Sequence, residues 1–398
     1  MFIPKFDNII VFDTETTINA PKPYFGATPA YIDNEVVACG WKHLKKGGQK
    51  PEVQIAFDST MEGVALHTHS GTDEVILVGH NISFDLHYLM EVYGDVPRNV
   101  VVWDTMKFEY MDSGRASANP SLEKTAQRYG IPFKKDDEVS ERFKMGMGAD
   151  KIDKELLSEY LEQDVEVTYK IFNTQIKKCL DKGAAYTNYM VEMMQGVTVT
   201  TSMSFHGMPF NVYAAQREVN ELEKTMDRLV QLVKAEWGDH NYNSPAQVKL
   251  LLWGGERKEE YMAQKYDEDG EELAYKSGKK KGELVRRKAT KLVRVDSLVT
   301  TAIEERFSNR GFSKDASATT LDRLVKMTSD LTSLHRFCRS LLKLRGYAKS
   351  INTYFQPYIE HTLRGYIHPN YNHSVTNTGR LSSSKPNMQN ISNKGEEK

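Results

Sequence analysis

The sequence predicts an α/β domain over its first part and a mainly helical region after it. Three observations lead to this prediction. Short apolar runs alternate with helical patterns over the first ~180 residues. From about Ala184 the apolar residues change to helical spacing. Polar and acidic residues directly follow two of the apolar runs, which is where the sheets of α/β domains collect their ligands.

The first domain is expected to contain four strands, one helix after the fourth strand and a long closing helix. The first of these helices is FDLHYLMEVYG (84–94), and the closing helix runs from about Lys154 to Leu180. The sequence DKGA that follows predicts a helix stop and a short linker. The four strands are NIIVFD (8–13), EVVACGWKHL (35–44), VQIAFD (53–58) and VILVGHN (75–81).

Four carboxylates and one phenol occur where such a fold is able to gather them. Residues two apart on a strand share a face, so Asp13 and Glu15 are expected to point the same way. Residues four apart on a helix stack on one face. This spacing is expected to align Asn81 with Asp85, and Tyr160 with Asp164.

A cluster of carboxylates is costly to assemble without a cation, and hard oxygen ligands suit Mg²⁺ or Mn²⁺. Two such ions roughly 4 Å apart can clamp the attacking and leaving oxygens of a phosphodiester. Tyr160 would then orient the attacking water. A lone Asp-x-Glu occurs by chance in many chains, and each of the other pairs fits an exposed helix face equally well. The ordered occurrence of all three pairs favours a catalytic site.

The segments FDTET, GHNISFDLHYL and YLEQD resemble the three motifs of 3′-5′ proofreading exonucleases with four acids and a tyrosine. The resemblance implies a ribonuclease H-like fold, a mixed sheet flanked by helices. Residues 103–131 resemble the region of this family in which one helix leads to a Ser-Leu-Glu start of the next. The resemblance of the three motifs also implies two metal ions held by Asp13, Glu15, Asp85 and Asp164, a water positioned by Tyr160, and a supporting hydrogen bond from Asn81.

Composition sets only broad limits on function. A chain of 398 residues suggests two or three domains, and 39% hydrophobic with 27% charged residues is ordinary for a soluble protein. The net charge of −1 argues against a uniformly basic nucleic-acid binder. No apolar run approaches the ~20 residues of a membrane span, and no signal pattern is evident. The three cysteines, Cys39, Cys179 and Cys338, are few and widely spaced, so we expect a protein of a reducing cytoplasm. The family resemblance implies that this is the cytoplasm of a bacterium or of a phage-infected host.

Helical patterns dominate from 184 to 365, a stretch that resembles a polymerase thumb. A long exposed helix is expected over 214–238. Ser244 is a good N-cap, Pro245 suits the first helical position and Gln247 completes a capping box. The same stretch resembles the Asn-x-Asn-Ser-Pro-x-Gln segment of family A DNA polymerases. A methionine-rich stripe is interpreted as core rather than a binding surface, and comprises Met190, Met193, Met194 and Val197.

A charged insertion occupies about 255–298, and residues 276–294 contain nine Lys or Arg against one Glu. Basic residues at this density suit backbone phosphates, but a solvated loop or hairpin is slightly favoured over a DNA-gripping element. A later helix is basic on one side, as a helix facing a duplex would be. Its basic residues are Arg336, Arg339, Lys343, Arg345 and Lys349.

The segment HPNYNHSVTNTGRLSSSKPNMQNIS (368–392) resembles family A DNA polymerases strongly. Its hydroxyls, amides and one arginine are able to bond phosphates and groove acceptors, although an ordinary polar loop has a similar composition. The resemblance implies that Arg380 reaches into the minor groove near the primer terminus. It further implies that the primer or template strand is supported by Ser383, Asn387, Gln389 and Asn390.

The domain prediction is therefore an exonuclease over 1–183, a helical thumb over 184–365 and the start of a palm over 366–398. The sequence stops at Lys398, before any counterpart of the polymerase palm and fingers motifs, and its final NKGEEK resembles the start of the next family segment. We expect either a fragment or a split polymerase completed by a separate chain, and synthesis only with that missing part. The substrates expected are primer–template DNA and single-stranded 3′ ends.

Two other functions remain open from the sequence. One is a non-catalytic, DNA-holding half of a split DNA polymerase. The other is a ribonuclease of the same nuclease superfamily that acts on RNA 3′ ends, against which the Thr-Gly-Arg segment argues.

Overall fold

A computed structural model describes residues 7–22, 27–47, 51–69, 73–115, 120–133, 137–276 and 279–391 of the protein. The chain divides into two compact units, Met1–Gln216 with Tyr354–Lys398, and Arg217–Thr353. This division differs from the expected domain boundaries near 183 and 365. The reason is that the helix after residue 183 packs onto the sheet of the first unit, and the carboxyl-terminal segment returns to the same unit.

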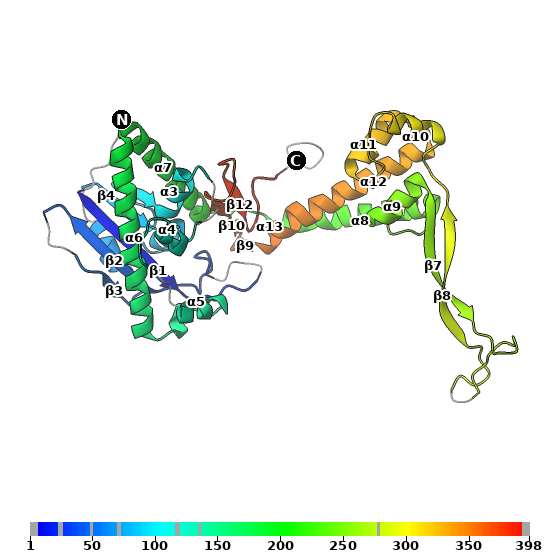
Figure 1. The fold of residues 1–398 in the computed structure, drawn as a ribbon, viewed down its shortest axis with the longest axis horizontal. Coiled ribbons are helices and arrows are strands. Elements are labelled where there is room, and N and C mark those ends of the chain that lie inside the picture. Colours follow the sequence, from blue (N-terminus) through cyan, green and yellow to red (C-terminus); the bar gives the residue numbers. More distant parts are fainter. Residues whose placement is uncertain are drawn as a thin grey trace. The chain divides into compact units, whose positions relative to one another are not determined.

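The first unit is built on a five-stranded mixed sheet with strand order β3-β2-β1-β4-β5 (Figure 1). The neighbours β1–β2 and β2–β3 are antiparallel, whereas β1–β4 and β4–β5 are parallel. The strands are β1 (Asn8–Thr16), β2 (Val36–Lys45), β3 (Gln54–Ala56), β4 (Val75–Gly79) and β5 (Val100–Asp104).

The four strands expected from the sequence are all present. The fifth, β5, was missed because it passes directly into a helix, and its last two residues, Trp103 and Asp104, were interpreted as the start of the helical segment 103–131. The predicted stop after the closing helix is confirmed at Gly183, which has φ 87°. The expected linker there is wrong, since the next helix begins at Ala184.

Helices cover both faces of the sheet, and the alternation along β1 decides which residues meet them. Ile10 and Phe12 pack on one face with residues of α1 (Glu62–His69) and α2 (Ser83–Tyr93). Val11 packs on the other face with residues of α6 (Lys154–Lys182) and α7 (Ala184–His206). Odd-numbered residues of β1 therefore point to the layer that contains α6.

The methionine-rich stripe on α7 belongs to the core, as predicted. Met190, Met194 and Val197 are buried at 1% exposure or less, and Met193 is half-buried. Burial of these side chains against β5 and α2 is what attaches α7 to the first unit.

Short helices connect the sheet to α6. They are α3 (Thr105–Asp112), α4 (Leu122–Arg128), α5 (Asp137–Lys144) and the 3-10 turn η1 (Ala149–Lys151). The predicted Ser-Leu-Glu helix start is confirmed, because the Ser121 hydroxyl accepts from the Lys124 amide as the N-cap of α4.

The carboxyl-terminal segment adds α13 (Gln356–Glu360) and two small sheets to the first unit. One sheet has the order β6-β10-β9 and joins Met208–Pro209, Tyr366–Ile367 and Thr362–Leu363. The other pairs β11 (Asn370–Asn372) antiparallel with β12 (Ser382–Ser384).

The second unit packs helices around its own apolar core, which includes Val233, Leu252, Phe307, Leu324 and Phe337. Its helices are α8 (Val212–Trp237), α9 (Pro245–Trp253), α10 (Thr301–Ser308), α11 (Ala318–Met327), α12 (Ser333–Lys349) and the π-helical segment η2 (Ser350–Phe355). The Ser244 N-cap is confirmed by its bond from the Gln247 amide, whereas the Gln247 side chain accepts from the Asn241 amide.

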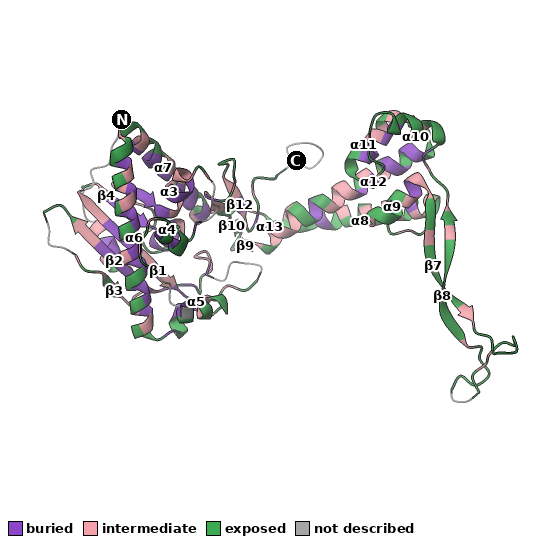
Figure 2. Ribbon diagram, in the orientation of Figure 1, coloured by how far each residue is buried: buried purple, intermediate pink, exposed green. Residues whose placement is uncertain are grey.

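The charged insertion forms a long hairpin of β7 (Gly255–Gln264) and β8 (Arg286–Val295). Most of its residues are exposed, whereas the helices of the same unit bury one side (Figure 2). Within the described ranges, none of the helices has both the length and the apolar character needed to cross a bilayer.

Candidate functional site

Three carboxylates converge near the carboxyl end of β1, the central strand of the mixed sheet. Asp13 and Glu15 lie on β1 at alternating positions, both half-buried, while Thr14 between them is buried. Asp164 lies on α6, the helix that covers the odd-numbered face of β1. Each of the three offers a ligand atom, and these atoms all lie within 4.8 Å of one another. The spacing of two on the strand thus has the predicted result, because both side chains face α6.

Tyr160 lies one turn before Asp164 on α6, as the spacing of four predicted, and both side chains are buried. Its ring packs edge-on against Phe143, with ring centroids 6.0 Å apart. Burial, followed by the nearby charges of Asp164, Glu15 and Asp13, raises the pKa of Tyr160 above its usual range. The phenol therefore stays protonated at ordinary pH, and its hydroxyl is adjacent to the three carboxylates.

Asp85 approaches β1 from the opposite side. It lies on α2, on the even-numbered face of the strand, where its Oδ1 accepts bonds from the Thr14 amide (3.0 Å) and the Thr14 hydroxyl (2.6 Å). It is not a member of the group of three carboxylates. Burial raises the pKa of Asp85 to about 7, even though both bonds from Thr14 act to lower it. Burial therefore raises the pKa of Asp85 by more than the two hydrogen bonds from Thr14 lower it.

The expected alignment of Asn81 over Asp85 on one helix face is wrong. Helix α2 begins at Ser83, and Asn81 precedes it with φ 63° in the turn after β4. Asparagine tolerates this left-handed conformation better than most residues. The Asn81 amide donates to the Asp104 carboxylate at 3.0 Å, so an acid from the neighbouring strand β5 fixes the turn. This acid was missed because it was interpreted as part of a helical segment rather than a strand end.

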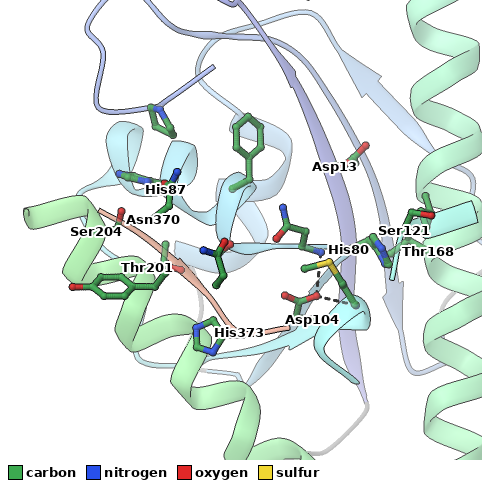
Figure 3. Close-up of a pocket in the computed structure, with 18 of the residues that line it drawn as sticks. Asp13, His80, His87, Asp104, Ser121, Thr168, Thr201, Ser204, Asn370 and His373 are labelled. Atoms are coloured by element: carbon green, nitrogen blue, oxygen red, sulfur yellow. Dashed lines mark hydrogen bonds between the residues drawn. The ribbon is translucent and has the colours of Figure 1, made fainter. Parts of the chain in front are cut away.

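A cavity of about 660 Å³ lies in front of the carboxylates. Asp13 and Thr168 line one end in Figure 3, and His87, Ser204 and Asn370 line the other. None of the described residues that line it is Lys or Arg. The cavity wall combines residues from the first 216 residues with strand β11 of the carboxyl-terminal segment.

His87 stands out among the lining residues. Burial, followed by the charge of His368, lowers the pKa of His87 to about 3, so the imidazole is neutral. Its Nε2 is buried and makes no hydrogen bond within the described part of the chain. The cavity therefore combines an acidic end with an end of neutral hydrogen-bonding groups.

The carboxyl-terminal residues expected to bind DNA differ in exposure. Arg380, Asn387, Gln389 and Asn390 are exposed, whereas Ser383 is buried at 5% exposure. The Ser383 hydroxyl donates to the Pro386 carbonyl and accepts from the Met388 amide, both at 3.2 Å. Ser383 therefore braces the turn in this structure, and the four exposed side chains are available to a ligand.

Comparison with known proteins places the polymerase resemblance in the carboxyl-terminal part of the chain. Residues 259–398 match the family described as DNA polymerase family A. A 63-residue segment is 41% identical to "DNA polymerase I, thermostable" of Thermus thermophilus, a match that covers 15% of this chain and 8% of that protein. A second T. thermophilus protein with the same description matches to the same extent. Sequence similarity thus relates residues 259–398 to family A DNA polymerases.

The whole fold is similar to a solved polymerase structure, "POL domain of Pol1 from M. smegmatis complex with DNA primer-template and dNTP". The TM-score is 0.56 at 15% identity, and the match covers 98% of this chain and 53% of that one. The chain therefore spans about half the length of that relative. At this identity the likeness concerns the fold alone.

Proposed function

We propose that the first unit is a 3′-5′ DNA exonuclease of a family A DNA polymerase, which hydrolyses phosphodiesters at a 3′ end with two divalent metal ions. The observation that carries the proposal is the group of Asp13, Glu15 and Asp164, whose ligand atoms lie within 4.8 Å of one another beside Tyr160. The strand order 3-2-1-4-5 of the mixed sheet supports the ribonuclease H-like fold that the motifs imply.

The donor set fits Mg²⁺ or Mn²⁺. All three grouped ligands are carboxylates, which are hard oxygen donors, and the described cavity lining contains no lysine or arginine. Asp13, Glu15 and Asp164 would hold one ion, and Asp85, which the motif resemblance implies as a fourth ligand, would serve the second ion when ionised. Bound there, two ions would stabilise the attacking and leaving oxygens of the scissile phosphate.

The residues of the chain have distinct parts in this reaction. Tyr160, protonated throughout the working range, orients the attacking water through its hydroxyl. Thr14 holds the Asp85 carboxylate in place with two hydrogen bonds. Asp104 fixes the turn that presents Asn81 to the cavity. The neutral end of the cavity, with Ser204 and Asn370, suits the bases and sugars of a single strand.

We propose further that the carboxyl-terminal segment contacts the primer–template. Arg380 would reach the minor groove, and Asn387, Gln389 and Asn390 would support the strands, with Ser383 bracing their turn. The match of 259–398 to family A DNA polymerases supports this assignment. If the chain instead only holds DNA for a separate polymerase part, it will bind primer–template and leave every 3′ end intact.

The test is digestion of 5′-labelled single-stranded DNA, 3′-recessed duplex and RNA of the same sequence, with Mg²⁺ or with EDTA. We expect a ladder of shortened DNA products in the reactions that contain Mg²⁺ and none in those that contain EDTA. Asp13→Asn and Asp164→Asn should abolish the ladder, while Asp181→Asn, an exposed acid on the same helix as Asp164, should not. An intact DNA substrate, equal digestion by the Asp164 variant, or faster digestion of RNA would overturn the proposal.

A further inference from the structure

Helix α3 connects the nuclease cavity with the carboxyl-terminal segment. At its start, Asp104 caps the helix by accepting from the Met106 amide at 2.9 Å, and the same carboxylate accepts from the Asn81 amide at 3.0 Å. Asn81 lines the cavity. The first turn of α3 and the edge of the nuclease site are thus held by a single buried carboxylate.

Lys107, also in the first turn of α3, holds His373, the residue that follows strand β11. The Lys107 ammonium donates to the Met193 carbonyl of α7 and lies 3.1 Å from Nδ1 of His373. The other ring nitrogen of His373 lies 2.6 Å from the Thr200 hydroxyl on α7. Lys107 is only 6% exposed, so this bridge is shielded from solvent. It joins three segments that are distant in the sequence.

The last turn of α3 and Arg115, three residues after the helix, hold the turn that precedes Arg380. The Tyr110 hydroxyl donates to the Thr376 carbonyl, and the Arg115 guanidinium donates to the Thr378 carbonyl at 3.2 Å. Gly379 has φ 74°, and a Cβ at this position would lie 2.5 Å from Cζ of Arg115. The guanidinium therefore lies directly against the glycine, and Arg380 follows at the next position.

We propose that α3 is the docking element that seats the 376–380 turn on the nuclease unit, with Tyr110 and Arg115 as positioning residues for duplex DNA. The inference rests on the proposed function and adds a division of labour to it. A single strand needs only the cavity, whereas a primer–template also needs Arg380 held at a fixed place relative to that cavity. Contacts occur in matching order along both segments, 107 with 373, 110 with 376 and 115 with 378, as a docking surface requires.

The effect should appear in duplex recognition rather than in cleavage. Each positioning bond is one hydrogen bond to a backbone carbonyl, so its loss should weaken duplex binding by about two- to tenfold. Tyr110→Phe is the sharper variant, since it removes only a hydroxyl and keeps a side chain that is 1% exposed and part of the core. Arg115→Met removes the second bond and the contact with Gly379.

The experiment uses the full chain and compares two substrates, a single-stranded oligonucleotide and a duplex with a mismatched 3′ terminus. Steady-state cleavage with Mg²⁺ gives kcat and KM for both, and fluorescence anisotropy in EDTA gives the duplex Kd without cleavage. Lys124→Met is the matched control, an exposed lysine on α4 that loses a charge outside the docking surface. Thermal denaturation of each variant verifies that the fold is retained.

We expect the Tyr110 and Arg115 variants to cleave the single strand within twofold of wild type, with KM and Kd for the duplex raised by about two- to tenfold. Lys124→Met should match wild type on both substrates. Variants that bind and cleave the duplex like wild type, or that lose both substrates equally, would overturn the inference and leave the nuclease proposal standing. A wild-type chain that cleaves neither substrate would overturn the nuclease proposal, and the anisotropy series would still decide the docking role.

Discussion

Replacing Tyr160 by phenylalanine isolates the one group at the site that is expected to act on the attacking water alone. The hydroxyl lies beside Asp13, Glu15 and Asp164, and burial with these charges keeps it protonated. It can therefore contribute a hydrogen bond but not an anionic base. A hydrogen bond to a charged partner contributes about 1.5–3 kcal/mol. If it forms fully only in the transition state, its loss lowers kcat about 10- to 150-fold.

The assay is single-turnover cleavage of a labelled single strand across a pH series, with metal affinity measured separately. Tyr160→Phe should lower kcat, leave KM and metal affinity within about twofold, and leave the shape of the pH profile unchanged. The matched control is Tyr169→Phe, which should behave as wild type. Tyr169 lies on the same helix, with the Lys42 ammonium over its ring. The reasoning is refuted if Tyr160→Phe retains full kcat, or if a basic limb of the wild-type profile disappears in the variant.

Three further predictions concern stability. Gly63→Ala on α1 should lower stability by about 1–3 kcal/mol, because its Cβ would lie 2.1 Å from the Trp41 indole. Gly346→Ala on α12 should raise the free energy of unfolding by about 0.5–1 kcal/mol, because a Cβ at Gly346 would meet open space. Denaturant titration measures the free energy of unfolding of both variants, and changes of the same sign would contradict the packing described at these two glycines. Burial acts to raise the pKa of Asp112, but bonds from Lys178, a second lysine and a tyrosine outweigh it and hold that pKa below its usual value. Asp112→Asn should therefore cost about 1–3 kcal/mol at pH 7. This difference should start to shrink as pH falls below ~4 and be lost only as pH falls through the lowered pKa of the folded protein, so a difference constant with pH would contradict this assignment.

The grouping of Asp13, Glu15 and Asp164 followed from the sequence because strand and helix periodicities fix directions locally. Asp13 and Glu15 share a face because they are two residues apart on β1, and Asp164 occupies a buried position on α6. These two features were enough to bring the three side chains together. The fold of the first unit was predictable to a similar degree, since four of its five strands were recognised from their apolar runs.

What the sequence left open depends on tertiary contacts. Asn81 adopts its left-handed conformation because the Asp104 carboxylate accepts a hydrogen bond from its amide, and Asp104 lies on a strand that was not recognised. Asp85 bonds to Thr14 because α2 and α6 cover opposite faces of β1, and helical spacing alone does not reveal the face. Strand β11 lines the same cavity as residues more than 150 positions away in the sequence, and no local pattern encodes such a contact.

The most direct measurement is the anomalous diffraction of crystals of the full chain soaked in Mn²⁺. The account predicts manganese within about 2.0–2.6 Å of carboxylate oxygens of Asp13, Glu15 and Asp164. This manganese peak should be lost in Asp13→Asn. Manganese that binds elsewhere while these carboxylates stay without it, or that remains in place in the Asp13 variant, would contradict the account.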